Sequence, residues 1–200
     1  MSEKIFITKH NGGKMDGMIS INFGIKPACH WRAAIPNSVC SKCYAIKQMS
    51  RDAFRAQERY TNNLLALMGG VDTSDIVPQR SVVRINSMGE VGSVEEQLQY
   101  FRMCKENPDT LFVQWTKEEN IVKEALSREN KPYNLRLIYS GLLLDKKVIK
   151  PYGFNHTFTV WKNVPMIERG HICEGKKCRE CMYCYKKNEG QYTHIFEKLR

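Results

Sequence analysis

The segment SVVRINSMGEVGSVEEQLQYFRMCK, residues 81–105, contains the unit that decides the fold class. Its first six residues are rich in β-branched side chains, which is typical of a strand packed in a sheet. Ser93 and Glu96 then have the spacing of a capping box, which predicts a helix that runs to about Lys105. The segment therefore predicts one strand–turn–helix unit of an α/β protein.

Similar units lie on both sides of this segment. Apolar or alternating runs predict further strands at residues 5–7, 18–23, 111–115, 135–139 and 157–161. Further helices are predicted at 51–68, with Ser50 as N-cap and Gly69–Gly70 as the end, and after a second capping box at 116–119. The connections are predicted as a hairpin turn at 11–13, a long loop at 26–41 and a short helical turn at 142–148.

This alternation of strands and helices predicts a parallel sheet with crossover helices. The units fall short of the eight that close a barrel, so we expect a partial (β/α) barrel or an open parallel sheet. Residues 1–165 would form this α/β domain, and residues 166–200 a cysteine-rich tail packed on the same domain. In such folds, function sits at the carboxyl ends of the strands.

Composition limits the classes of function. The chain has 200 residues, which is long enough to bury a hydrophobic core. Its formal net charge of +10 would suit nucleic acid or another anionic partner. The sequence shows no secretory leader and no run near the roughly 20 apolar residues of a membrane span, so we expect a cytoplasmic protein with no membrane partner. It also lacks a glycine-rich phosphate loop and an H-E-x-x-H motif, which leaves kinase and hydrolase functions little support.

Four cysteines stand close together near the end of the chain, with the spacing C-x4-C-x2-C-x2-C, at Cys173, Cys178, Cys181 and Cys184. Thiolates are soft ligands for zinc, copper(I) and iron–sulfur clusters, and eight cysteines in a cytoplasmic protein indicate metal rather than disulfides. The x2 steps favour an iron–sulfur cluster, and zinc is the alternative. Basic residues in or beside this run would offset the negative charge of such a centre: Lys176, Lys177, Arg179, Lys186 and Lys187.

A second set of cysteines, Cys29, Cys40 and Cys43, follows the strand predicted at 18–23. Three ligands leave one iron of a 4Fe–4S cluster without a protein ligand, and chemistry at a metal needs an open position. The alternatives are a distorted zinc site or three buried core thiols. His30 or His171 could add a ligand, although a lone histidine is more often structural, and Cys104 is expected to fill the core.

Polar residues follow the predicted strands at the edge where function is expected. Glu90, Lys117 and Lys162 are the candidate catalytic groups, and Ser140 is a candidate for holding a cofactor or substrate. Cys173 or Cys184 could also complete the early centre, because neighbouring clusters can exchange ligands. The sequence therefore predicts one or two 4Fe–4S clusters, with zinc as the alternative.

Three stretches of the chain resemble the gene-product-88-like proteins of bacteriophages, which would place it in the host cytoplasm. They are the loop from Cys29 to Ala45, which ends in Cys-Tyr-Ala, the strand end at 84–90, and the tail from Gly175 to Cys184. The layout is also similar to that of the radical SAM superfamily. This second resemblance implies that the early cysteines hold a 4Fe–4S cluster and that Met88, Gly89 and Glu90 form the turn that binds S-adenosylmethionine.

Three functions are open at this point. The first is a redox or radical-SAM-like enzyme with an unknown substrate. The second is a basic module, stabilised by zinc or a cluster, that binds nucleic acid and stacks bases on Tyr183, Tyr185 and Tyr192. The third is an electron-transfer protein that works with an electron donor protein and has no substrate.

Overall fold

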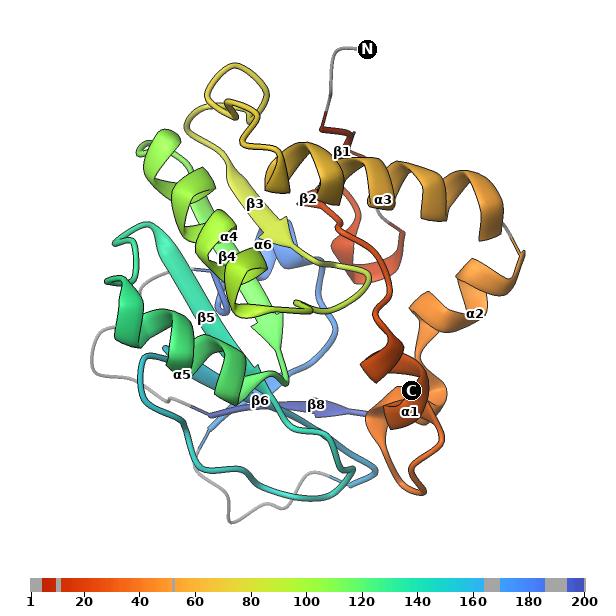
Figure 1. Cartoon of the computed structure of the whole chain (residues 1–200). Coiled ribbons are helices and arrows are strands. Elements are labelled where there is room, and N and C mark those ends of the chain that lie inside the picture. Colours follow the sequence, from red (N-terminus) through yellow and green to blue (C-terminus); the bar gives the residue numbers. More distant parts are fainter. Residues whose placement is uncertain (1–4, 10–11, 52, 164–169, 186–193, 200) are drawn as a thin grey trace.

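The described strands form one eight-stranded sheet in the order β1-β2-β3-β4-β5-β6-β8-β7 (Figure 1). The structure is a computed structural model, and it describes residues 5–9, 12–51, 53–163, 170–185 and 194–199. The strands are β1 (Ile7–Thr8), β2 (Ile19–Ile21), β3 (Val82–Ile85), β4 (Leu111–Thr116), β5 (Leu135–Ser140), β6 (His156–Trp161), β7 (His171–Cys173) and β8 (His194–Lys198). The helices are η1 (Gly13–Met15), α1 (Pro27–Ala33), η2 (Val39–Lys42), α2 (Tyr44–Arg51), α3 (Ala53–Met68), α4 (Val94–Glu106), α5 (Glu119–Arg128) and α6 (Cys178–Cys181).

The sheet is open and mostly parallel. β1 pairs with β2 in the antiparallel direction, as the hairpin prediction required, and every other pair is parallel. Residues 10 and 11 of the predicted hairpin turn lie outside the described residues. β1 and β7 stand at the two ends of the strand order, so the sheet does not close on itself. The prediction of an open parallel α/β sheet is therefore confirmed, and the barrel alternative is not.

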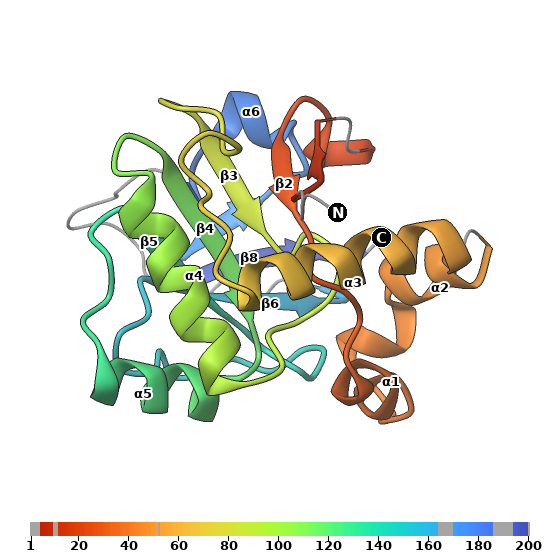
Figure 2. The ribbon, with the colours of Figure 1, turned by 45° about the horizontal axis from the view of Figure 1, so that its top comes forward.

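Two different layers cover the two faces of the sheet. Helices α3, α4 and α5 lie on one face, and α6 lies on the other (Figures 1 and 2). Along β3, Val83 and Ile85 belong to the helix-covered core, whereas Val82 packs on the second core. The alternation follows from the two-residue period of a strand, which sends successive side chains to opposite faces.

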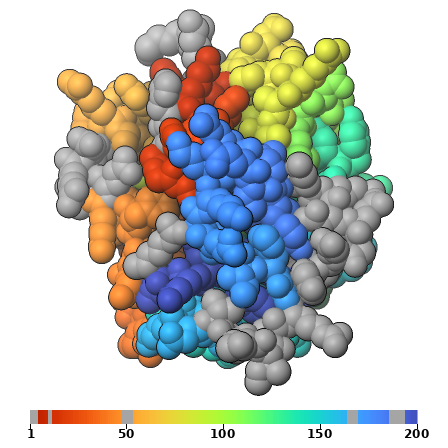
Figure 3. Space-filling view, turned by 180° about the vertical axis from the view of Figure 1, so that it is seen from behind, coloured from red at the N-terminus to blue at the C-terminus, as the bar shows by residue number. Residues whose placement is uncertain are grey.

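The second face is covered by the cysteine-rich tail. Its core contains Met15, Met18, Val113, Ile138 and Tyr185, and α6 contacts η1. Figure 3 views this side and shows tail residues in blue across its centre, beside N-terminal residues in red. The tail thus supplies one wall of a hydrophobic core, because Tyr185 is almost fully buried there.

The start of α4 and the end of α3 confirm the sequence predictions. Ser93 Oγ accepts a hydrogen bond of 3.1 Å from Glu96 N at the start of α4. The Glu96 carboxylate accepts from Gly92 N at 2.9 Å, one residue before the position that a capping box would use. Helix α3 ends at Met68 and is followed by Gly70 with φ +83°, a value that glycine adopts without strain.

Some local predictions are wrong. The expected loop at 26–41 contains helix α1, which begins at Pro27, since proline is well suited to a first helical turn. Ser50 lies inside α2 and is not an N-cap. Thr116 belongs to β4, and its hydroxyl accepts from Glu118 N at 2.9 Å instead of capping α5 from a capping box.

The chain after residue 140 also differs from the sequence predictions. Residues 142–148 form no helical turn, because Leu143 makes an isolated bridge to Ser38. The tail adds two strands, β7 and β8, that no pattern had indicated. Among the described helices, none is long and apolar enough to cross a membrane.

Candidate functional site

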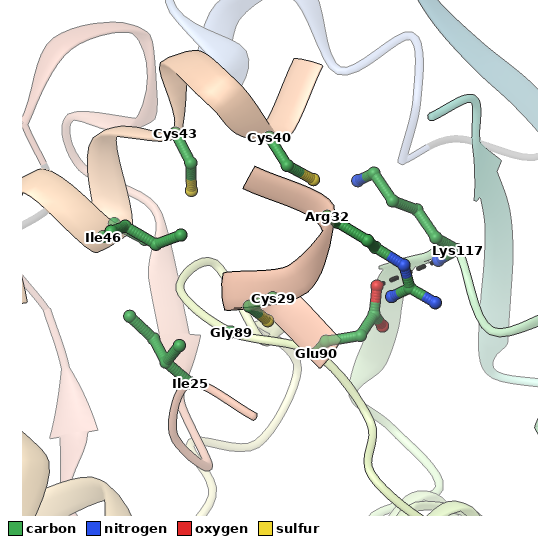
Figure 4. Close-up of a pocket in the computed structure, with 10 residues that line it drawn as sticks. Ile25, Cys29, Arg32, Cys40, Cys43, Ile46, Gly89, Glu90 and Lys117 are labelled. Atoms are coloured by element: carbon green, nitrogen blue, oxygen red, sulfur yellow. Dashed lines mark hydrogen bonds between the residues drawn. The ribbon is translucent and has the colours of Figure 1, made fainter. Parts of the chain in front are cut away.

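A cavity of about 70 Å³ lies beyond the carboxyl ends of β2, β3 and β4. Its lining residues are Ile25, Cys29, Arg32, Cys40, Cys43, Ala45, Ile46, Gly89, Glu90 and Lys117. Figure 4 shows Arg32, Glu90 and Lys117 on one side of the cavity, and Ile25 and Ile46 on the other. This edge of the sheet is where function was expected, and the cavity has one ionic side and one apolar side.

The structure brings the three early cysteines together around this cavity. Cys29 lies in α1, Cys40 in η2 and Cys43 directly after η2. Ser38 Oγ accepts from Cys40 N at 2.9 Å and caps η2, and Cys43 N donates to Cys40 O at 3.0 Å. Burial raises the pKa of Cys29, with the neighbouring Glu90, Cys40 and Cys43 adding to the rise. The local structure therefore holds three thiols near one point.

Glu90 forms part of the ionic wall. It is buried, and its carboxylate accepts from Val91 N at 3.0 Å and from Lys117 N at 2.9 Å. The second bond joins the turn after β3 to the end of β4 and is dashed in Figure 4. Burial raises the pKa of Glu90, whereas the charge of Lys117 and these backbone donors act against the rise. Glu90 thus fixes the shape of the site, whatever its part in chemistry.

Gly89 allows the turn after β3 to pass close to the segment that follows β2. Its φ is +104°, in the region that favours glycine, and a Cβ at this position would lie 2.0 Å from Gly24 O. No other residue type fits so close an approach to backbone. The predicted cofactor turn Met88–Glu90 therefore has glycine at the point where its backbone lines the cavity.

The other two ionic residues of the wall have partners. Lys117 Nζ donates to Ser140 Oγ at 3.2 Å, so the structure joins two of the predicted site residues. Arg32 Nη1 lies 2.7 Å from Glu118 Oε1, and this hydrogen bond is the main cause of the raised pKa of Arg32. The ionic side chains of the wall therefore have partners within the chain, a carboxylate for Arg32 and a neutral hydroxyl for Lys117.

This cavity is not lined by four of the predicted residues: Met88, Ser140, Lys162 and His30. Met88 is buried, and its Sδ accepts from the Tyr60 hydroxyl at 3.4 Å. Lys162 is exposed, with Nζ 3.8 Å from Asp145 Oδ2, and does not line the cavity. His30 is exposed on α1. Arg32 was not among the predicted site residues. The signal for it is Pro27 as a helix start, because the i, i+3 spacing then places Arg32 beside Cys29.

The four tail cysteines line a second, wider cavity of about 400 Å³ on the other face of the sheet. Cys178 and Cys181 lie on α6, Cys173 ends β7, and Cys184 follows α6. Burial raises the pKa of Cys184 to about 12, and the neighbouring thiols of Cys173 and Cys178 contribute. The ring of His171, which also lines the cavity, stacks on Tyr183 with centroids 3.5 Å apart.

All eight cysteines of the chain are free thiols, and Cys104 is buried in the core as expected. Within the described ranges, no three cysteine, histidine or acidic side chains stand in a ready-made metal-binding arrangement. The predicted residues Lys186, Lys187 and Tyr192 lie outside those ranges. Each thiol set is therefore a group of neighbouring donors that would have to close around a metal.

The fold and the cavities define an open parallel α/β protein with thiols gathered at the carboxyl edge of its sheet. The family model of Gene product 88 matches residues 7–163, so the chain belongs to the Gene product 88 family. The matched range contains the early cysteines and Glu90, and it ends before Cys173. No match to the chain was found among curated proteins or among solved structures.

Proposed function

We propose that this chain is an iron–sulfur protein in which Cys29, Cys40 and Cys43 hold a 4Fe–4S cluster for redox or radical chemistry. The observation that carries the proposal is that these thiols, from separate local elements, line one cavity at the carboxyl edge of a parallel sheet. Three protein ligands would leave one iron accessible to a further ligand. A bound cluster would supply single electrons, which the polypeptide alone does not provide.

The residues around the early cavity fit such a group. Its volume of about 70 Å³ is several times the roughly 10–15 Å³ that one water needs, so the space between the thiols is not filled by side chains. Arg32 and Lys117 would offset part of the negative charge that three thiolates bring. Binding would still need α1 and η2 to bring the three sulfurs into ligand geometry.

The turn at Met88–Glu90 supports a place for S-adenosylmethionine beside the cluster. Gly89 presents backbone without a side chain at the cavity, and the buried Glu90 carboxylate holds the turn against β4. Lys117 and Ser140, joined by a hydrogen bond, would position polar groups of the same ligand. In this proposal, these chain residues bind and orient the cofactor and exclude water from it.

The tail would hold a second centre. Its four thiols line one cavity, and four thiolates complete the coordination of zinc or of a second iron–sulfur cluster. With no open position, such a centre would stabilise the fold or carry electrons. A second candidate function for the protein is electron transfer without a bound substrate. The small volume of the early cavity favours it.

The test is metal and sulfide analysis of protein purified without oxygen. We expect iron and sulfide in the unaltered chain, with loss of the early centre in Cys43→Ala and of the tail centre in Cys181→Ala. Cys104→Ala is the matched control, since its thiol is buried in the core away from both cavities. Zinc without iron in all variants would contradict the proposal. Cleavage of S-adenosylmethionine by the reduced protein tests the cofactor separately.

A further inference from the structure

Arg84 places a permanent positive charge between the sheet and the cysteine-rich tail. It lies on β3 between Val83 and Ile85, which face the helix-covered core, so its side chain points to the second face. Its guanidinium lies 4.2 Å from the centroid of the Trp115 ring, and Nη1 is 3.3 Å from Met15 Sδ. Its Nε is buried and has no hydrogen-bond partner.

No carboxylate among the described residues pairs with Arg84. In contrast, other partly buried cations pair with glutamates, as Lys14 does with Glu197 and Arg32 with Glu118. Removing a cation from water is costly unless an anion lies nearby, and contact with an aromatic ring recovers only part of that cost. Among the residues that the structure describes, no carboxylate therefore balances this cation on the second face.

The groups that face Arg84 lead to the tail thiols. The hydroxyl of Tyr185, a buried tail residue, donates to Met15 Sδ at 3.4 Å, and Arg84 contacts the same sulfur. The Tyr185 ring packs on Trp115 with centroids 5.4 Å apart, and Cys178 and Cys184 pack against the same cluster. Burial lowers the pKa of Arg84, but the neighbouring Tyr185, Tyr44 and Cys178 raise it above its usual value. The tail cysteines are therefore the groups in the described chain that could supply the missing negative charge.

We infer that Arg84 is the counter-cation of an anionic centre that the four tail thiolates form around a divalent metal. This inference rests on the tail centre proposed above. Four thiolates around Zn²⁺ leave a net charge of about −2, and a fixed cation beneath them favours that state over the empty, protonated thiols. Arg84 acts through the field of its charge on the tail thiolates, as a positioning residue rather than as a ligand.

The experiment titrates Zn²⁺ alone into the metal-free, reduced full-length chain in competition with a chelator. The zinc site that Cys181→Ala removes defines the tail centre. We expect Arg84→Met to weaken this site about 10- to 100-fold, the usual effect of removing a residue behind the ligands. Arg84→Lys keeps the charge and should restore most of the affinity, which a purely packing role of the guanidinium on Trp115 would not allow.

Arg136→Met is the matched control. Arg136 lies on β5 on the same face, also has a buried Nε without a partner, and donates to backbone carbonyls of Tyr133 and Leu135. This variant should leave zinc affinity unchanged.

Wild-type affinity in Arg84→Met would overturn the inference while the tail centre stands. A chain with no zinc site sensitive to Cys181→Ala would instead remove the proposed tail centre. If Arg84→Met does not fold, Arg84→Gln decides, because it also removes the charge and unchanged affinity there also overturns the inference.

Discussion

The two thiol-lined cavities differ in where they lie and in how their charges are balanced. The early cavity, about 70 Å³, lies at the carboxyl edge of the sheet, and its ionic residues already have partners within the chain. The tail cavity, about 400 Å³, lies on the face of the sheet that carries Arg84, a cation with no carboxylate partner among the described residues. One site is formed by strand ends and short helices, whereas the other is continuous with a hydrophobic core.

This difference separates two tasks. Residues at the edge of a sheet can change position without disrupting the core, which suits a site that admits a ligand and releases it. Residues that cover a face of the sheet also hold the fold together, because their removal exposes apolar surface. We therefore expect changes in the tail to cost stability first and changes at the early cavity to cost binding first.

The largest expected effect tests the structural role of the tail. Tyr185→Ala removes a ring that is 1% exposed and packs against Trp115 with centroids 5.4 Å apart. Loss of a large buried aromatic side chain costs about 3–5 kcal/mol in the free energy of unfolding. Urea unfolding of the metal-free protein measures it. The control is Tyr133→Ala, whose ring is 74% exposed and should change stability little. Equal effects for the two variants would mean that the tail is not part of the core.

An intermediate effect is expected at the edge. Gly89→Ala places a methyl group 2.0 Å from Gly24 O at φ +104°, so the turn after β3 must shift. Strain of this kind costs about 1–3 kcal/mol. The amount of metal bound at the early site should also fall, while the tail should keep its metal. Metal analysis of Gly89→Ala in the Cys181→Ala background measures the early site, and in the Cys43→Ala background it measures the tail. Gly12→Ala is the control, because a Cβ there meets nothing within 4 Å. Normal early-site metal in Gly89→Ala would show that the turn does not shape this cavity.

The smallest effect concerns the paired charges of the early site. Glu118→Gln removes the partner of Arg32, whose side chain is 19% exposed, and should cost about 1 kcal/mol or less, declining as salt is added. Early-site metal content should stay the same, because the freed cation still lies beside the thiols. Thermal unfolding at low and high salt provides the measurement. A large loss of metal would show that the ion pair positions the ligands, and would make the two sites more alike than we propose.

The central part of the fold could be predicted because local and tertiary signals agree there. β3 and β4 are mostly apolar strands between two layers, interrupted by Arg84 and Gln114, and Ser93 caps α4 as its sequence spacing indicates. Strands with both faces covered need such runs whatever their neighbours are. The parallel sheet and its helix-covered face could therefore be predicted from the sequence.

The parts that could not be predicted depend on partners distant in sequence. β7 is a three-residue strand, and β8 includes the charged Glu197 and Lys198, so neither has a clear apolar pattern. Their strand form depends on pairing, β8 with β6 and β7 with β8. At the early site, the three cysteines were identified by type and order, but the ionic wall depends on the contact between the turn after β3 and the end of β4.

The position of β8 between β6 and β7 has a consequence for biosynthesis. β7 precedes β8 in the chain, yet within the described sheet its hydrogen-bonded neighbour is β8. A ribosome releases β7, which ends in Cys173, before β8, so this cysteine reaches its paired position in the sheet only after β8 has been made. Capture of a metal by the tail would then be a late event in maturation, governed by the iron and zinc supply of the cell at that moment.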